Sequence, residues 1–334
     1  MKTVVITGCS GQDGSYLAEL CLAKGYKVIG INTWNSTGNI NLKNVIDNKF
    51  FKLETGDIID KEFIHRIFMK YTPVDYFYNL GAISYVAESF KIPIKTFTVN
   101  TLAVINILEE IRTYSPKTKF YQASTSEMIG RNKNLPQNTE STMIPNSPYA
   151  VAKLASHHMV RLYREAYGLF ACSGLLYNHE SERRGVDFVT RKITLGISDI
   201  YHKRKQFIIL GNINSCRDWG HAKDYVNAQI LMMEADNADD YTVCTGKTFT
   251  IRQFVEEAFN YIGEKITWNG TGLKEVGINQ NGIVRVKISK EFYRPAEVDF
   301  LKGDNSKILK KLNWKPTITF KELVKMMVKN DLKQ

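Results

Sequence analysis

The chain has 334 residues, of which 43% are hydrophobic and 24% are charged, and its formal net charge is +11. This is the composition of an ordinary globular protein with ample material for a large core, and the length favours about two domains. The Lys and Arg residues are scattered, without a long basic tail or a basic stripe interleaved with aromatic residues, which argues against a nucleic-acid partner. No apolar run reaches the ~18 residues that a membrane-spanning helix needs. We therefore expect neither nucleic acid nor membrane as a partner.

The cysteines and histidines exclude two further classes of site. The five cysteines are odd in number, widely spaced and without a C-x-x-C pair, which argues against a disulfide framework and against zinc. The six histidines have no metal-binding spacing. The N-terminus enters a glycine turn too early for a signal peptide. We expect no metal and a cytoplasmic location.

The N-terminus begins with a short β-branched run at residues 2–7, and Gly8, Gly11 and Gly14 follow before a helical pattern at residues 15–24. This order of strand, glycine turn and helix is typical of a dinucleotide site. In such a site the first glycine permits the turn, the second lets a pyrophosphate approach, and the third lets helix and strand pack closely. The helix N-terminus then attracts the phosphates. The alternative is a glycine-rich turn of an unrelated α/β protein.

Strand-like and helical patterns continue to alternate after this unit. We expect strands at residues 27–32, 50–53, 76–80, 119–123 and 172–177, and helices at residues 61–71, 98–114 and 149–167. This alternation predicts the α/β class with a Rossmann-type doubly wound parallel sheet.

The pattern changes after residue 178, where the loops lengthen. Two capping boxes, Thr250 with Gln253 and Thr319 with Glu322, predict short amphipathic helices. We expect a dinucleotide-binding Rossmann domain at residues 1–178. Residues 179–334 are expected to form mainly a smaller α+β substrate lobe, with some chain returning to the sheet.

Tyr149 and Lys153 lie one helical turn apart on the predicted helix 149–167, so they share a face. A nearby ammonium favours the phenolate, so we expect it to lower the tyrosine pKa and to make the phenol a usable general base. Two other pairs have the same spacing: Tyr201 with Lys205, and Tyr261 with Lys265. Only Tyr149 follows a predicted strand with a polar exit, residues 124–127, where sheet-edge chemistry is expected.

These motifs resemble the extended short-chain dehydrogenases/reductases that act on nucleotide sugars, and further segments are similar to the GDP-mannose 4,6-dehydratase family. Those segments are residues 11–17, residues 78–82 with Ser84, residues 122–127, residues 178–181 with Arg183, Arg184 and Gly185, residues 217–225, and Arg294-Pro295 with Glu297 and Val298. The resemblance covers essentially the whole chain. It implies GDP-mannose as the substrate, NADP as the cofactor, and a homodimer or homotetramer.

The resemblance also implies the chemistry. Tyr149 would take the proton of the sugar's 4-hydroxyl while a hydride leaves carbon 4 for the nicotinamide. Glu127 would then remove the carbon-5 proton, and Glu127 and Thr125 are the candidates for delivering a proton to the water that leaves carbon 6. The hydride returns to carbon 6 and gives GDP-4-keto-6-deoxy-mannose. The alternatives are a carboxylate at a helix N-terminus for Glu127 and a capping hydroxyl for Thr125.

Further contacts are implied residue by residue. The implied cofactor contacts are Gly8, Gly11, Gln12, Asp13, Gly14, Asp57, Ile58, Leu80, Gly81, Ala82, Ser84, Tyr149, Lys153, His179 and Arg184. The implied substrate contacts are Ser84, Ser126, Asn178, Lys192, Arg217, Arg294 and Glu297. Both substrate arginines suit a diphosphate because a guanidinium binds two oxygens together. The alternatives are surface ion pairs for the arginines and a loop histidine bonded to backbone for His179.

One departure from the family concerns the cofactor. Family members usually carry two arginines after the second strand, which hold the 2′-phosphate of NADP and contact a neighbouring subunit. Residues 31–36 here read Ile-Asn-Thr-Trp-Asn-Ser, so Thr33, Asn35 and Ser36 offer hydrogen bonds but no charge. NAD is therefore the alternative cofactor, and the choice between dimer and tetramer stays open. Glu182 also stands where a proline is usual.

Three other functions compete with a GDP-mannose dehydratase. A related nucleotide-sugar epimerase needs no carbon-5 base, and related dehydratases typically carry an Asp-Glu pair where this chain has Ser126-Glu127. A dinucleotide sensor without turnover would not need Tyr149, Lys153 and Glu127 together. A nucleic-acid binder would show steep salt dependence.

Overall fold

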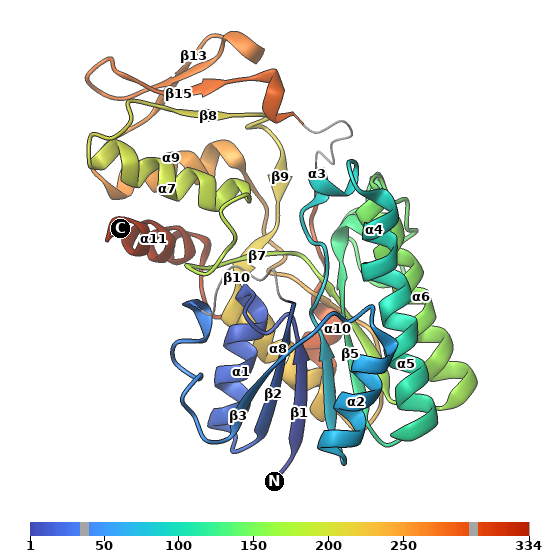
Figure 1. Ribbon diagram of the computed structural model, residues 1–334. Coiled ribbons are helices and arrows are strands. Elements are labelled where there is room, and N and C mark those ends of the chain that lie inside the picture. Colours follow the sequence, from blue (N-terminus) through green and yellow to red (C-terminus); the bar gives the residue numbers. More distant parts are fainter. Residues whose placement is uncertain (34–39, 294–299, 334) are drawn as a thin grey trace.

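The computed structural model describes residues 1–33, 40–293 and 300–333. Its larger part is a seven-stranded sheet in the order β11-β6-β5-β4-β1-β2-β3, with parallel pairing throughout. The strands are β1 (Thr3–Thr7), β2 (Lys27–Asn32), β3 (Phe51–Thr55), β4 (Tyr76–Asn79), β5 (Lys119–Thr125), β6 (Ala171–Leu176) and β11 (Tyr241–Val243). Helices cover both faces of this sheet (Figure 1), which confirms the predicted doubly wound fold.

The two faces of the sheet enclose separate cores, because successive side chains of a strand point to opposite faces. Val4 and Ile6 belong to one core and Val5 to the other. The first core packs against α1 (Gln12–Ala23), α8 (Ala222–Glu234) and α10 (Ser306–Leu312). The second packs against α2 (Lys61–Tyr71), α5 (Ala103–Tyr114) and α6 (Pro148–Tyr167). Every central strand is therefore buried on both sides, as its continuous apolar run predicts.

Two of the predicted helices differ from the structure by more than two residues, while the predicted strands agree within two residues. Residues 98–114 do not form one α-helix, since η2 (Thr98–Leu102) is a π-helical turn that follows α4 (Pro93–Phe97) and precedes α5. The helix after the phosphate loop begins at Gln12 rather than at residue 15, because Gly11 already serves as its N-cap. A short helix, α3 (Val86–Ser89), was not predicted.

The smaller lobe has its own core between three helices and a four-stranded sheet (Figure 1). The helices are α7 (Val189–Tyr201), α9 (Ile251–Tyr261) and α11 (Phe320–Asp331). The strands, in sheet order, are β13 (Thr267–Asn269), β14 (Val276–Ile278), β15 (Val284–Ile288) and β8 (Ile208–Leu210). Both predicted capping boxes are present, at the first residues of α9 and α11.

Two short strand pairs lie where the chain passes between the sheet and the smaller lobe. β7 (Asn178–Glu180) pairs in parallel with β10 (Trp219–His221), and β9 (Cys216–Arg217) pairs antiparallel with β12 (Phe249–Thr250). β11 then carries the chain back to the large sheet beside β6. In the part of the chain that the structure describes, no helix has both the length and the apolar character to cross a membrane.

Candidate active site

The turn after β1 has the shape of a phosphate cradle. Gly8 has a φ of +65°, which favours glycine, and a Cβ at Gly14 would lie 2.4 Å from the carbonyl oxygen of Gly8. The first turn of helix α1 therefore lies so close to Gly8 that only a glycine fits at position 14. Its N-cap Gly11 has no side chain to occupy the N–H groups of the first turn. These features fit a bound dinucleotide, whose pyrophosphate accepts such N–H groups.

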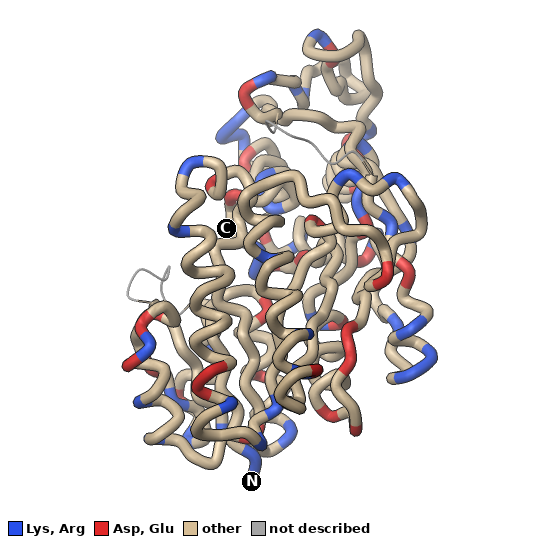
Figure 2. Tube along the Cα trace, turned by 90° about the vertical axis from the view of Figure 1, so that its right-hand side faces the viewer, with Lys and Arg blue, Asp and Glu red and all other residues tan. Residues whose placement is uncertain are grey.

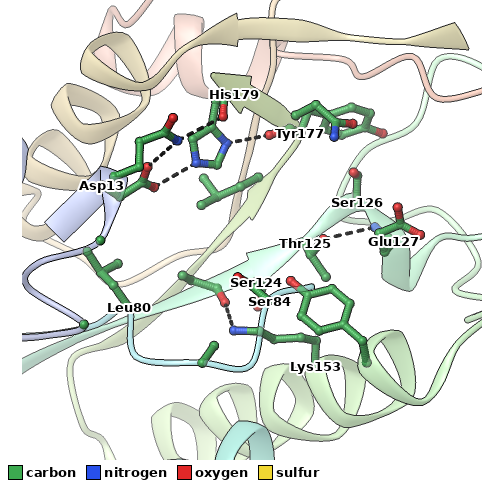
Figure 3. A pocket seen from close by; sticks show the side chains of 18 of the residues that line it. Asp13, Leu80, Ser84, Ser124, Thr125, Ser126, Glu127, Lys153, Tyr177 and His179 are labelled. Atoms are coloured by element: carbon green, nitrogen blue, oxygen red, sulfur yellow. Dashed lines mark hydrogen bonds and ion pairs between the residues drawn. The ribbon is translucent and has the colours of Figure 1, made fainter. Parts of the chain in front are cut away.

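The four predicted catalytic side chains line one cavity of about 320 Å³ beside this turn. Thr125 ends β5, Glu127 follows in the short 3-10 helix η3 (Ser126–Met128), and Tyr149 and Lys153 extend from the first turns of α6. The Thr125 hydroxyl shares a hydrogen bond with Tyr149. Figure 3 shows Thr125, Glu127 and Lys153 around the same space. Three elements, β5, η3 and α6, thus supply a phenol, an ammonium, a hydroxyl and a carboxylate to one place.

The pKa of the Tyr149 phenol in this pocket is not lowered as the sequence predicts. Burial raises the pKa of Tyr149 to about 12, with the Glu127 charge acting in the same direction, whereas the Thr125 hydrogen bond lowers it. Burial lowers the pKa of Lys153 to about 8. The prediction that the ammonium lowers the phenol pKa is therefore wrong for this state of the protein, because loss of water around the phenol dominates. The Lys153 Nζ instead donates to the carbonyl oxygen of Ala123 at 2.8 Å.

A buried ladder of hydrogen bonds joins the strand ends beneath the pocket. The Thr7 hydroxyl donates to the Asn79 side-chain oxygen at 2.7 Å, and the Asn79 amide donates to the Gln122 side-chain oxygen at 2.8 Å. Gln122 in turn donates to the Ala123 carbonyl oxygen at 3.2 Å, the atom that also accepts from Lys153. The ladder couples the ends of β1, β4 and β5 to the lysine, because each amide uses both its donor and its acceptor.

His179 and Asp13 form a buried pair at the N-terminus of α1 (Figure 3). The His179 Nε2 lies 2.8 Å from the Asp13 Oδ2, and its Nδ1 lies 2.7 Å from the Tyr177 carbonyl oxygen. Because both neighbours are acceptors, both ring nitrogens carry protons and the ring is cationic. Burial opposes this charge, but the Asp13 carboxylate outweighs it and raises the pKa of His179. The pair balances the negative charge that Asp13 would otherwise present to a phosphate.

Thr125 and Glu127 keep both of their possible roles. The Thr125 hydroxyl accepts from the Glu127 N–H at 3.3 Å and so caps η3, while Glu127 stands in the first turn of that helix. Both residues also line the cavity. The capping geometry and access to a ligand are therefore compatible here.

A second cavity of about 510 Å³ adjoins the first, and Asn178, Arg184 and Phe188 line both. Lys192 and Arg217 line the second cavity. Arg217 is only 5% exposed, so it is a buried arginine rather than a surface one. The Lys192 Nζ lies 3.1 Å from the centre of the Phe292 ring. A partly aromatic chamber with both basic and acidic side chains in its lining thus continues from the catalytic pocket.

The remaining predicted residues fall into three groups. The first cavity is lined by Gly8, Gly11, Gln12, Asp13, Gly14, Leu80, Gly81, Ala82, Ser84 and Ser126, besides His179. Asp57 and Ile58 do not line it, although the end of the Ile58 side chain would lie 3.3 Å from a Cβ at Gly81. Arg294 and Glu297, like Asn35 and Ser36, lie outside the described residues.

The two competing Tyr-Lys pairs lie elsewhere. Tyr201 is 57% exposed and Lys205 pairs with Asp199, while Tyr261 is 36% exposed at the end of α9. None of the four lines either cavity. Context beside a strand end, rather than spacing, separates the buried pair from these two.

Several lining residues were not predicted from the sequence. They include Val86, Leu176, Tyr177, Phe188, Asn212, Trp219, Phe292 and Tyr293. Apolar and aromatic walls carry no spacing signal of their own. The one available cue was the position of Phe292 and Tyr293 directly before Arg294. Within the described ranges, no group of three His, Cys, Asp or Glu residues is placed to hold a metal ion.

Comparison with known proteins shows to which family the chain belongs. A family model described as GDP-mannose 4,6 dehydratase matches residues 5–327. A GDP-mannose 4,6 dehydratase from Drosophila melanogaster is 46% identical over 343 residues, covering 99% of this chain and 86% of that protein. A GDP-mannose 4,6-dehydratase from Vibrio cholerae is 44% identical over 351 residues, covering 99% of this chain and 94% of that protein.

Solved structures share the fold at lower identity. A dTDP-glucose 4,6-dehydratase from Bacillus anthracis in complex with NAD has a TM-score of 0.83 and 20% identity, over 100% of this chain and 97% of that one. RMD from Pseudomonas aeruginosa complexed with NADPH has a TM-score of 0.79 and 19% identity, over 100% of both chains. At such identities the likeness shows the fold.

Proposed function

The chain belongs to the GDP-mannose 4,6-dehydratase family, and from this premise we propose how its own residues carry out the reaction. It is a hydro-lyase that converts GDP-mannose to GDP-4-keto-6-deoxy-mannose. When bound, a nicotinamide dinucleotide would supply the redox chemistry, namely reversible acceptance of the hydride that leaves carbon 4 of the sugar and returns to carbon 6. The observation that carries the residue roles is the meeting of Tyr149, Lys153, Thr125 and Glu127 in one cavity beside the phosphate turn.

Tyr149 is the proposed base for the 4-hydroxyl of the sugar. Because burial raises its pKa to about 12, the phenol needs a further positive charge before it gives up its proton. Lys153 would support this step through its ammonium and would donate to the cofactor ribose, and its Nζ is held at the pocket floor by the Ala123 carbonyl oxygen. Glu127 is placed to remove the carbon-5 proton. Glu127 or Thr125 then delivers a proton to the hydroxyl that leaves carbon 6 as water, and carbon 5 regains a proton when the hydride returns to carbon 6.

The two cavities divide the ligands in this proposal. Gly8, Gly11 and the N-terminus of α1 hold the pyrophosphate of the dinucleotide, with His179 and Asp13 beside it. The GDP part of the substrate extends into the second cavity, where Asn178, Lys192 and Arg217 supply donors and positive charge. Arg294 and Glu297 are assigned to the same ligand by family resemblance. Residues 1–178 thus serve mainly the cofactor and residues 179–334 mainly the substrate.

NADP is the proposed cofactor, on family resemblance, with NAD as the alternative. The sequence from Ile31 to Leu42 contains no Lys or Arg to hold a 2′-phosphate. Discrimination between the two cofactors is therefore expected to be weak, since neutral donors distinguish a phosphate less strongly than a guanidinium does.

Incubation with GDP-mannose and either NADP or NAD tests the function. The expected product has lost one water, with no net reduction of cofactor, and the product mass and the absorbance of reduced nicotinamide measure the two quantities. An unchanged mass would instead indicate an epimerase, and stoichiometric reduced cofactor would indicate a simple dehydrogenase. Either result would overturn the proposal.

A homodimer is the proposed assembly. Helices α4 and α6 pack together, and large apolar side chains on them and on η2 are exposed, Ile94 at 83%, Leu102 at 48%, Val151 at 46% and Leu162 at 49%. Figure 2 faces these helices, whose traces are mostly uncharged. We call Ile94, Leu102, Val151 and Leu162 the apolar helix face. A second copy is the simplest partner, because exposed apolar patches on a globular protein mark interaction sites.

A cytoplasmic location is proposed from the cysteines. All five are free thiols, and four of them are buried. Free thiols of this kind are typical of reducing compartments.

A further inference from the structure

The segment between β7 and α7 stands at the boundary of the two cavities. Its Arg184 lines both, and the guanidinium carbon lies 3.6 Å from the centre of the Phe188 ring. The Arg184 Nε pairs with the Glu180 Oε2 at 3.0 Å, and Glu180 also accepts from the Thr190 hydroxyl at 2.6 Å. Arg184 is thus held at the place where the two cavities meet.

The backbone of this segment is held by a second arginine from the first turn of α7. The Arg191 Nη1 donates to the carbonyl oxygens of Glu182 and Arg184, the latter at 3.2 Å. Arg191 is only 7% exposed, and a guanidinium does not lose its charge inside a protein. It therefore needs an anion in the interior.

That anion comes from the last residue of α11. The Asp331 Oδ2 lies 2.9 Å from the Arg191 Nε and accepts from the Thr194 hydroxyl at 2.6 Å. Its other oxygen, Oδ1, accepts from the Asn330 side chain at 3.0 Å. Asp331 is 0% exposed, so water does not compete for the carboxylate. Asp331 thus supplies the charge opposite Arg191, although α11 contributes no side chain to the lining of either cavity.

We infer that Asp331 is a positioning residue for substrate binding, acting through Arg191 on the Glu182–Arg184 backbone. Without the carboxylate, Arg191 becomes an uncompensated buried cation, a strongly unfavourable state. Its guanidinium then turns toward water and releases the two carbonyl oxygens, so that Arg184 loses its fixed place. The inference rests on the proposed function, because it names the loop whose geometry that function requires.

Asp331→Asn tests the inference, since the variant keeps the shape and removes the charge. The KM for GDP-mannose is expected to rise about tenfold or more, with a smaller fall in kcat, because Arg184 is also one of the charges that act on Tyr149. Lys329→Ala, on the exposed side of the same helix, is the matched control and should keep the parent KM. Asp331→Glu, which keeps the charge, should restore part of the affinity.

A merely structural role would lower the melting temperature and leave the KM of the folded enzyme unchanged. A folded Asp331→Asn enzyme with the parent KM therefore overturns the inference and leaves the proposed function intact. If Asp331→Asn does not fold, Arg191→Lys decides, because a lysine keeps the charge but lacks the fork that reaches two carbonyls and a carboxylate. A parent KM in that variant also overturns the inference. A parent enzyme that does not dehydrate GDP-mannose overturns the proposed function instead.

Discussion

Glu127 reaches the cavity from the short helix η3, whose first turn is capped by Thr125. The Thr125 hydroxyl caps η3 and also bonds to Tyr149, so one side chain sets both the carboxylate and the phenol. Removing the cap would disturb two steps of the reaction at once. Glu127 is therefore the better residue for isolating the carbon-5 step.

Glu127→Gln is expected to keep GDP-mannose binding and to lower dehydration by about 10²–10⁴-fold, the usual worth of a general base. The amide retains the size of the side chain but cannot take the carbon-5 proton. Product mass measures turnover, and exchange of the carbon-5 hydrogen with deuterated solvent measures the step itself. Glu140→Gln, at an exposed position outside the cavity lining, is the control. Turnover of Glu127→Gln at the parent rate would assign the base to another group.

The His179–Asp13 pair makes stability depend on pH with a definite sign. The Asp13 carboxylate raises the pKa of His179 against burial, so the contribution of His179 is full below its ordinary value of 6.5 and is lost as pH rises through the raised value. Burial would raise the pKa of Asp13, but the His179 charge lowers it below 3.8, so its contribution is lost only as pH falls through that lowered value.

His179→Asn should therefore cost about 3–5 kcal/mol of unfolding free energy near neutral pH, the usual penalty for removing one partner of a buried pair. The difference from the parent should shrink as the pH is raised into the alkaline range. Denaturant unfolding of the cofactor-free protein at several pH values measures it. His158→Asn, at an exposed position on α6, controls for loss of an imidazole. A difference that stays constant across the alkaline range would show that the pair is not ionic.

The first helix and its strand meet through glycine rather than through side chains. A Cβ at Gly14 would lie 2.4 Å from the Gly8 carbonyl oxygen and 2.7 Å from the Cys9 Cα, and both are backbone atoms without freedom to move aside. Gly14→Ala is expected to lower stability by about 1–3 kcal/mol by overpacking, and to weaken cofactor binding because the N-terminus of α1 moves. Thermal melting and a cofactor titration measure the two effects.

Gly185→Ala is the control, because the atom nearest to an added Cβ there is a Phe188 ring carbon at 3.4 Å. Little loss of stability is expected for this variant. Equal losses in both variants would contradict the packing argument.

The elements that the sequence predicts well are those with a local cause. The predicted helix at Lys61–Tyr71 agrees with the structure because Asp60 caps it. The capping boxes likewise mark the residues at which α9 and α11 begin. The π-helical turn of η2 had no such signal, since its residues are compatible with an ordinary helix. The sequence does not predict the pairs β7–β10 and β9–β12, because strands of two or three residues form only through pairing with a segment that is distant in the sequence.

The same distinction holds inside the site. Glycines and the Tyr149–Lys153 spacing identify one wall of the first cavity, because turn geometry and helical periodicity are local. That Phe188 and Phe292 line the cavities follows only from the three-dimensional structure. The raised pKa of Tyr149 likewise depends on burial, which no spacing rule supplies.

At the scale of the whole molecule, the second cavity lies where the smaller lobe meets the large sheet. Its lining joins Asn178 of β7 to Lys192 of α7 and Arg217 of β9. The chain after residue 178 also returns to the sheet through β11, so the two lobes are tied together by more than one crossing. Binding at this junction therefore depends on contacts remote from the ligand, such as the α11 contact to α7.

Helices α4 and α6 and the turn η2 carry the apolar helix face, which predicts an assembly of two copies. Val151 and Leu162 are three helical turns apart on α6 and so share one side of the helix, while Ile94 and Leu102 lie on the neighbouring α4 and η2. Light scattering during gel filtration should give twice the subunit mass of 38.2 kDa.

The double variant Val151→Glu, Leu162→Glu should elute as the monomer, since four charges would have to be desolvated in the interface of two copies. Leu309→Glu, at a similar exposure of 45% on α10, should leave the assembly unchanged. A parent mass of four subunits would require a second contact besides this face, and a double variant that keeps the parent mass would place the interface elsewhere.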